Sequence, residues 1–371
     1  MTDKSKAKQY ERIKLILSLS ETALIIILLV YFIFSGLSIE LKNRVLTITD
    51  SIYAGFFIYV AALAVVLTAI SVIFSFISGY YFEHRYHLSN QSFWAWTWET
   101  FKGLVVGLVL SIPLLFLFFY FINRFPQTWW IWMGAAMFVF SVLLSRIAPQ
   151  VIFPLFYKFE PVDNPEILER MQKLAKKGKF TLKGIFRFNM SKDTVKANAA
   201  FTGIGKSKRI ILGDNLLNSF SADEIEAVFA HEVGHFVHLH ILIRLFTGTF
   251  SSFLIFFLAD FLYNIFDNSL GFNGITDMAG LPLLVVLMIL AGFVITPFDN
   301  ALSRHHERQA DRYAVLNSSN PQAFITSMKK LSDINLADTK PNAVVEFLFH
   351  GHPAIDKRIR FANDIINESQ K

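Results

Sequence analysis

The chain has 371 residues, of which 53% are hydrophobic and 17% are charged, and its mean hydropathy is +0.44. A typical soluble domain carries about a quarter charged residues, so this composition indicates an integral membrane protein. The net charge of +6 could suggest a nucleic-acid partner, but the basic residues cluster beside apolar stretches, as topology signals do, and we expect no nucleic acid. Since the chain has no cysteine, disulfides and thiolate ligands are excluded, and His, Asp or Glu must hold any metal.

Six apolar stretches are long enough to cross a bilayer, which requires about 20 helical residues. They cover approximately residues 17–37, 52–80, 103–123, 129–149, 241–266 and 280–300. The first follows a basic segment, but no small-residue cleavage site comes after it, so we interpret it as a true membrane span and not as a signal peptide.

The charges between these stretches predict the topology. Lysines before the first span favour a cytosolic start, and four spans then return the chain to the cytosol. Between Leu245 and Ser303 there is no Lys or Arg, whereas Asp267 and Asp277 lie in the intervening loop. We therefore expect that loop outside and both termini in the cytosol.

Four regions follow from this pattern: a membrane region with four spans over 1–150, a soluble segment over 151–240, two spans within 241–300, and a cytosolic tail over 301–371. In the soluble segment we expect a helix over 165–177, and strands over 184–189, 199–204 and 209–212, the last two joined by a hairpin turn at 205–208. Ser221 and Glu224 form a capping box ahead of a further helix. The tail from Pro321 is expected to form amphipathic helices, interrupted at 351–353.

The helix after Ser221 contains an HExxH motif. His231 and His235 lie four residues apart, so on a helix both imidazoles can face one Zn²⁺. Glu232 lies beside them, where its carboxylate can take a proton from a metal-bound water. The motif predicts a zinc hydrolase.

Two histidines leave such a site short of one ligand, and spacing alone leaves the third open. His238 is a local candidate because it shares the helical face of His231. Glu307 and Asp311, which follow the last span, are a remote candidate, since residues four apart lie on one face of a helix. One carboxylate could bind zinc while the other orients a ligand histidine. An ordinary salt-bridged, solvated helix would have the same spacing.

Several motifs together resemble the CAAX prenyl protease 1 family of membrane-embedded HExxH metalloproteases. These are ERQAD over 307–311, separated from HExxH by two apolar spans, FEHRYHLSNQ over 82–91, IFPLFYKFEP over 152–161, NAAF over 198–201 and KRIIL over 208–212. The resemblance covers roughly residues 75–365. The N-terminal part departs from it, because we find one span there where eukaryotic members have two.

The resemblance implies a role for individual residues. His231, His235 and Glu307 would bind one Zn²⁺ per chain, with Asp311 as the partner of a ligand histidine. Glu232 would be the general base, and His352 and Arg358 would stabilise the oxyanion. Asn198 and Ala199, at an exposed strand edge, would bind the substrate backbone. The roles of His238, His240 and His350 are left unassigned.

The expected fold is a mainly α-helical polytopic membrane protein with about six transmembrane helices and a small α/β zinc metalloprotease domain, and the resemblance implies that the helices enclose a chamber. The resemblance implies a metalloendopeptidase that cleaves membrane-associated or prenylated CAAX-type proteins. The short first half suggests a prokaryotic member in the bacterial inner membrane, with the active site toward the cytosol, or in the ER membrane if eukaryotic. A quality-control protease of broad specificity is the alternative within the enzyme class, and a non-catalytic zinc-binding scaffold is the alternative outside it.

Overall fold

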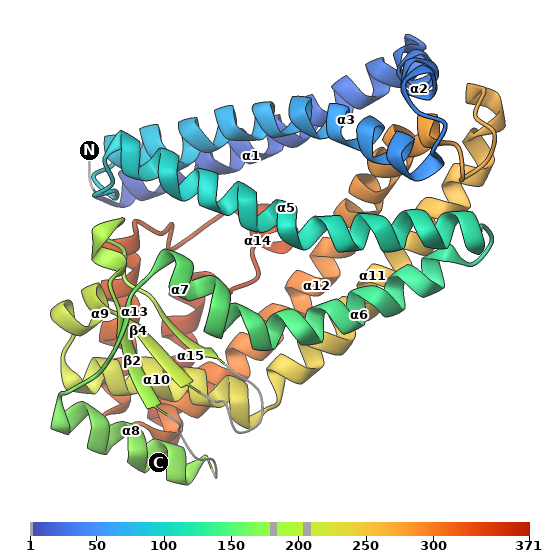
Figure 1. Ribbon diagram of the computed structural model, residues 1–371. Coiled ribbons are helices and arrows are strands. Elements are labelled where there is room, and N and C mark those ends of the chain that lie inside the picture. The colour runs from blue at the N-terminus through green and yellow to red at the C-terminus, as the bar shows by residue number, and fades with distance from the viewer. Residues whose placement is uncertain (1–2, 179–183, 203–208) are drawn as a thin grey trace.

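The computed structural model describes residues 3–178, 184–202 and 209–371. Within these residues six helices are long and apolar enough to cross a membrane, which confirms the six expected spans. They run over Ser5–Phe34, Ile52–Arg85, Phe93–Arg124, Trp129–Phe156, His240–Phe266 and Met278–Asn317. Figure 1 shows these helices extending to one side of a smaller domain that holds the sheet and the C-terminus.

Among the described residues, the membrane part contains nine α-helices and two π-helical segments, η1 and η2. They are α1 (Asp3–Phe34), α2 (Leu37–Ile48), α3 (Ile52–Ser75), η1 (Phe76–Tyr81), α4 (Phe82–Arg85), α5 (Phe93–Arg124), α6 (Trp129–Ile147), η2 (Ala148–Ile152), α7 (Phe153–Phe156), α11 (His240–Phe266) and α12 (Leu281–Asn317). The short 3-10 turns η5 (Asn268–Leu270) and η6 (Met278–Gly280) lie in the loop before α12. At this end Lys42 Nζ is 2.9 Å from the Asp277 carboxylate, so α2 is tied to the loop.

The smaller domain combines a mixed sheet with helices. Its elements are β1 (Phe159–Pro161), α8 (Pro165–Lys177), β2 (Gly184–Phe188), η3 (Met190–Lys192), β3 (Ala199–Thr202), β4 (Arg209–Gly213), α9 (Asp214–Ser219), α10 (Ala222–Val237), α13 (Pro321–Asn335), α14 (Ala343–Phe349) and α15 (Ile355–Ser369). The strand order is β1-β2-β4-β3, with β2 and β4 parallel and the other two pairs antiparallel.

The expected helices and strands of this domain are present. Strand β3 lies at an edge of the sheet, as a substrate-binding strand requires. The short strand β1 was not anticipated, because three residues provide too little alternation to recognise. The expected hairpin turn over 205–208 lies outside the described residues, although β3 and β4 pair in the antiparallel sense that such a turn would give.

One hydrophobic core joins segments that the membrane spans separate in sequence. Met171, Ile210 and Phe229 from the first segment pack with Ala314 and Phe324 from the tail. The parts over 151–240 and 301–371 therefore form one folded unit. Helix α12 runs unbroken through residue 300, so one rigid element begins in the membrane and ends in this core.

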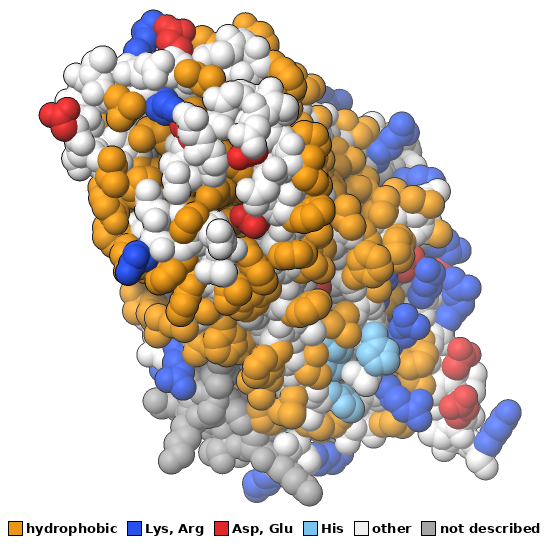
Figure 2. All heavy atoms as spheres, turned by 90° about the vertical axis from the view of Figure 1, so that its right-hand side faces the viewer, with side chains coloured by type: hydrophobic (Ala, Val, Ile, Leu, Met, Phe, Trp, Pro, Cys, Tyr) orange, Lys and Arg blue, Asp and Glu red, His pale blue; other side chains and the backbone are white. Residues whose placement is uncertain are grey.

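The remaining spans pack loosely against one another. In five of the six spans no more than 11% of the most apolar stretch is buried, compared with 61% in the last. Most of their side chains therefore face lipid or internal space, and Figure 2 shows hydrophobic side chains over much of the surface. An apolar cavity of about 350 Å³ lies among α1, α3, α5, α6, α11 and α12.

Helices α10 and α12 pack closely because Gly234 has no side chain. A Cβ at this position would lie 2.8 Å from Ala310 Cα and 3.1 Å from Ala310 O, which are backbone atoms that cannot move aside alone. We predict that Gly234→Ala separates the two helices and destabilises the protein by about 1–3 kcal/mol. Thermal unfolding in detergent measures this. Gly292→Ala on α12, where no atom lies within 4 Å, is the control and should unfold at or above the wild-type temperature.

Candidate active site

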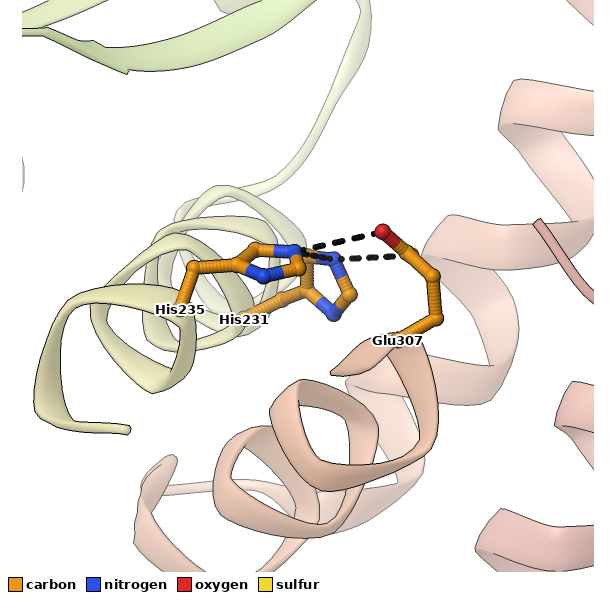
Figure 3. A group of neighbouring side chains, drawn as sticks. All are labelled: His231, His235 and Glu307. Carbon is orange, nitrogen blue, oxygen red and sulfur yellow. Dashed lines mark hydrogen bonds and ion pairs between the residues drawn. The ribbon is translucent and has the colours of Figure 1, made fainter. Parts of the chain in front are cut away.

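Helix α10 carries the HExxH motif, and local sequence signals explain where it begins. The side chain of Ser221 accepts a hydrogen bond from the Glu224 N–H, and the Glu224 carboxylate accepts one from the Ser221 N–H. This predicted capping box is therefore confirmed, and it satisfies N–H groups that a helix start leaves free. One turn apart near the end of α10, His231 and His235 extend toward α12 (Figure 3).

Glu307 extends from α12 to meet the two histidines (Figure 3). Its Oε2 is 3.4 Å from Nε2 of His231, and its Oε1 is 3.3 Å from Nε2 of His235. The two Nε2 atoms are 3.1 Å apart. Among the described residues this is the one group of three such side chains whose potential ligand atoms all lie within 4.8 Å of one another.

The geometry of this group fits a tetrahedral metal ion. Ligand atoms about 2.1 Å from a tetrahedral Zn²⁺ lie about 3.4 Å from one another, and the observed spacings of 3.1, 3.3 and 3.4 Å are close to that value. Two imidazole nitrogens and one carboxylate oxygen, without a thiolate, are typical zinc ligands. Three protein ligands leave a fourth position open, as in catalytic sites.

Asp311 lies one turn beyond Glu307 on α12 and supports His231 from behind. Its Oδ1 is 2.9 Å from His231 Nδ1, and Arg358 donates to both of its oxygens, at 2.9 Å from Nε and 2.6 Å from Nη2. Asp311 is fully buried. Burial alone disfavours the imidazolium, but the hydrogen bonds with Asp311 and Glu307 outweigh it and raise the pKa of His231 to about 9. A carboxylate placed in this way fixes the tautomer and orientation of a ligand histidine.

The two residues expected to stabilise the oxyanion differ in their surroundings. His352 is an exposed side chain whose Nδ1 lies 2.9 Å from Glu307 Oε2. Arg358 is buried, its Nε and Nη2 donate to Asp311, and its Nη2 also lies 3.4 Å from Nδ1 of His231. Arg358 therefore also holds Asp311 in place, a duty that the sequence did not reveal.

A cavity of about 770 Å³ connects these groups with the sheet edge. Its lining includes every residue that the sequence analysis assigned to catalysis or substrate, together with two of the three metal candidates: His231, Glu232, Glu307, Asn198, Ala199, His352 and Arg358. Asn198 is exposed just before β3, and Ala199 begins that strand. A peptide lying along the edge of β3 would therefore reach the candidate metal site within one cavity.

The first membrane helix also lines this cavity, which the sequence did not indicate. Tyr10 and Lys14 of α1 lie in its wall. Both contact Glu83, and Lys196, just ahead of β3, pairs with the same carboxylate at 2.8 Å. Lys14, one of the basic residues that predict the topology, therefore also attaches the first span to the segment just ahead of β3 through Glu83.

Arg304 is a second residue that sequence reasoning missed. Its Nη1 donates to the carbonyls of Glu346 and His350, at 3.0 and 2.7 Å, and Arg304 is 8% exposed. Asn300, one turn earlier on α12, donates to Leu348 O at 2.8 Å. These bonds hold the end of α14 and the loop that carries His352. Nothing in the local sequence links Arg304 to residues more than forty positions away.

His238, the local alternative for the third ligand, lies apart from the group of potential ligands. It caps the end of α10 and is exposed, and no metal group among the described residues includes it. The remote alternative, Glu307, is the one that the fold brings to the histidines.

Two family models together match most of the chain. The model described as peptidase family M48 matches residues 161–366, and the model described as CAAX prenyl protease N-terminal, five membrane helices, matches residues 2–158. The chain belongs to peptidase family M48. It is therefore a membrane metalloprotease. Where the description of the N-terminal model counts five membrane helices, the described residues of this M48 peptidase contain four spans and the short helix α2.

Relatives cover nearly the whole M48 peptidase. An uncharacterized metalloprotease, YhfN, of Bacillus subtilis is 30% identical over 364 residues, covering 96% of this chain and 84% of the relative. CAAX prenyl protease 1 of Saccharomyces cerevisiae is 29% identical over 357 residues, which cover 90% of this chain and 78% of the relative. The crystal structure of S. mikatae Ste24p superimposes with a TM-score of 0.84 at 26% identity, covering 97% of this chain and 89% of that one. The expected family and membrane fold are confirmed.

Because Arg304 fixes the loop before His352, its replacement should affect turnover more than metal binding. We predict that Arg304→Lys, which keeps the charge but cannot span the same carbonyls, lowers kcat about 10–100-fold with metal content unchanged. Metal analysis and peptide hydrolysis on the same preparation test this. Arg308→Lys, exposed on the same helix, is the control. Equal activity of the two variants would contradict the role of Arg304.

Proposed function

We propose that this M48 peptidase is a zinc metalloendopeptidase that holds one Zn²⁺ between His231, His235 and Glu307. The observation that carries the proposal is the convergence of two imidazole nitrogens and a carboxylate from α10 and α12 at one side of an open cavity. Bound zinc supplies a Lewis acid that polarises the scissile carbonyl and lowers the pKa of a water molecule.

The residues around this site would perform the proton transfers. Glu232 follows a candidate ligand directly and lines the cavity, so its carboxylate can take the proton of the attacking water and deliver it to the leaving amine. His352 and Arg358 would donate to the carbonyl oxygen as it gains negative charge. Asp311, by holding Arg358, keeps that donor oriented before the substrate arrives.

The substrate would lie extended along the edge of β3. Main-chain pairing with an edge strand gives affinity without requiring a particular sequence. Asn198 and Ala199 stand where that edge enters the cavity. The Asn198 carbonyl oxygen of the side chain accepts a bond from the Ala199 N–H at 2.8 Å, which leaves the amide NH₂ directed to other partners, such as a substrate carbonyl.

We further propose that the substrates are membrane-associated proteins with CAAX-type C-termini, including prenylated ones. The relative from Saccharomyces cerevisiae bears the name CAAX prenyl protease 1, and one from Arabidopsis thaliana is named as its homolog. The cavity includes Tyr10 and Lys14 at the beginning of the first span, so a chain end held at the membrane could enter it. The basic segment before that span favours a cytosolic location of the site, in a bacterial inner membrane or an ER membrane.

The first test separates proton transfer from metal binding. We predict that Glu232→Gln lowers hydrolysis of a model peptide by about 10²–10⁴-fold, because the general base is lost, while zinc content stays at one per chain. Glu307→Gln should lose zinc and activity together, and His238→Ala should keep both. An unaltered rate in Glu232→Gln would contradict the mechanism. If the zinc-loaded wild type hydrolyses no peptide in detergent or in liposomes, the enzyme proposal is wrong and a non-catalytic zinc-binding scaffold is supported instead.

The second test concerns the substrate. Two CAAX peptides that differ only in an S-farnesyl or a small S-alkyl group are presented in liposomes. We predict that the farnesylated peptide is cleaved at least about 10-fold faster, because the farnesyl chain anchors it at the membrane beside the cavity. Mass spectrometry of the products should show release of the last three residues. Equal rates, with cuts at several positions, would instead support the quality-control alternative.

A further inference from the structure

His240 is a buried histidine beside the HExxH motif that the mechanism above does not use. It begins α11, is 1% exposed, and its Nδ1 lies 2.9 Å from Nδ1 of His235. On its other side, His240 Nε2 lies 2.8 Å from Oε1 of Gln309 on α12. The ring also stacks on His306 with centroids 4.1 Å apart, which fixes its plane. A ligand candidate is thus connected through His240 to α12.

A break between α10 and α11 makes this contact possible. On a continuous helix, positions 235 and 240 would face directions about 140° apart. Helix α10 ends at Val237, and Leu239 adopts a left-handed conformation with a φ of 57°. This conformation is unfavourable for a residue with a side chain, so tertiary contacts must hold it. It turns His240 back onto His235.

The hydrogen bonds from His235 through His240 to Gln309 have one consistent donor-to-acceptor direction. His235 faces the other potential ligands through Nε2, so its Nδ1 carries the proton and donates. His240 must then accept at Nδ1, which places its own proton on Nε2. Gln309 Oε1 accepts that proton. Each nitrogen has one role, and no two donors face each other.

We propose that His240 and Gln309 are positioning residues that fix the tautomer and orientation of His235 as a zinc ligand. The two ligand histidines are then supported in different ways, His231 by the carboxylate of Asp311 and His235 by a neutral imidazole–amide pair. Neutral support orients the ring without adding negative charge beside the metal. The inference rests on the proposed zinc site, and it links that site to the membrane helices α11 and α12.

The test measures zinc affinity, by competition with a chelator, in the full-length Glu232→Gln protein, where turnover cannot interfere. His240→Leu removes the acceptor, whereas the Oδ1 of His240→Asn replaces Nδ1 near the same place. We expect about 10–100-fold weaker zinc binding for His240→Leu, and binding within a few-fold of the parent for His240→Asn. The d–d absorption of Co²⁺ in the site should change for His240→Leu only. Val237→Ala, exposed at the end of α10, is the control.

A second pair of variants, at Gln309, tests the same role in case the His240 variants do not fold. Gln309→Leu should weaken zinc binding, because the Nε2–H of His240 loses its acceptor, whereas Gln309→Glu should retain it. Equal zinc affinities of Gln309→Leu and the parent would contradict the positioning role of His240 and Gln309. Equal losses of zinc affinity in His240→Leu and His240→Asn would also contradict it. If Glu307→Gln also binds zinc like the parent, the proposed zinc site itself is wrong. If Glu307→Gln loses zinc while the substitutions at His240 and Gln309 leave zinc affinity unchanged, only the positioning role of His240 and Gln309 is rejected.

Discussion

The close contact between α10 and α12 is the constraint on which the rest of the site depends. Gly234 brings the backbone of α10 against Ala310, and this approach sets His231 and His235 opposite Glu307 and Asp311. Two helices in such contact can place charged and polar groups face to face while excluding water. The buried carboxylates are tolerated because they meet imidazoles and a guanidinium.

Helix α12 distributes the parts of the site along one face. Asn300 and Arg304 hold the loop that ends at His352, Glu307 faces the histidines, and Asp311 joins His231 to Arg358. These positions lie three or four residues apart, so they share a face of the helix. Since the same helix crosses the membrane without a break, the site is built on a membrane span and not attached to it through a linker.

Several membrane elements reach the cavity from other directions. The start of α1 contributes Tyr10 and Lys14 to its wall, and α11 begins with His240 behind a candidate ligand. The peptidase domain also joins two segments that flank α11 and α12 in one core. The membrane and peptidase parts are therefore interleaved, which explains why the chain returns to the membrane between His235 and Glu307.

The sequence by itself determined the features that depend on local periodicity and composition. The six spans follow from runs of apolar residues, the start of α10 from Ser221 and Glu224, and the pairing of His231 with His235 from a four-residue spacing on one helix.

The tertiary structure alone decided contacts between distant segments and those that require a break in periodicity. Spacing could not choose between His238 and Glu307, because that choice depends on how α10 packs against α12. It could not link Arg304 to the loop before His352, which lies more than forty residues away. His240 meets His235 only because Leu239 interrupts the helix, and a left-handed leucine has no signal in the sequence.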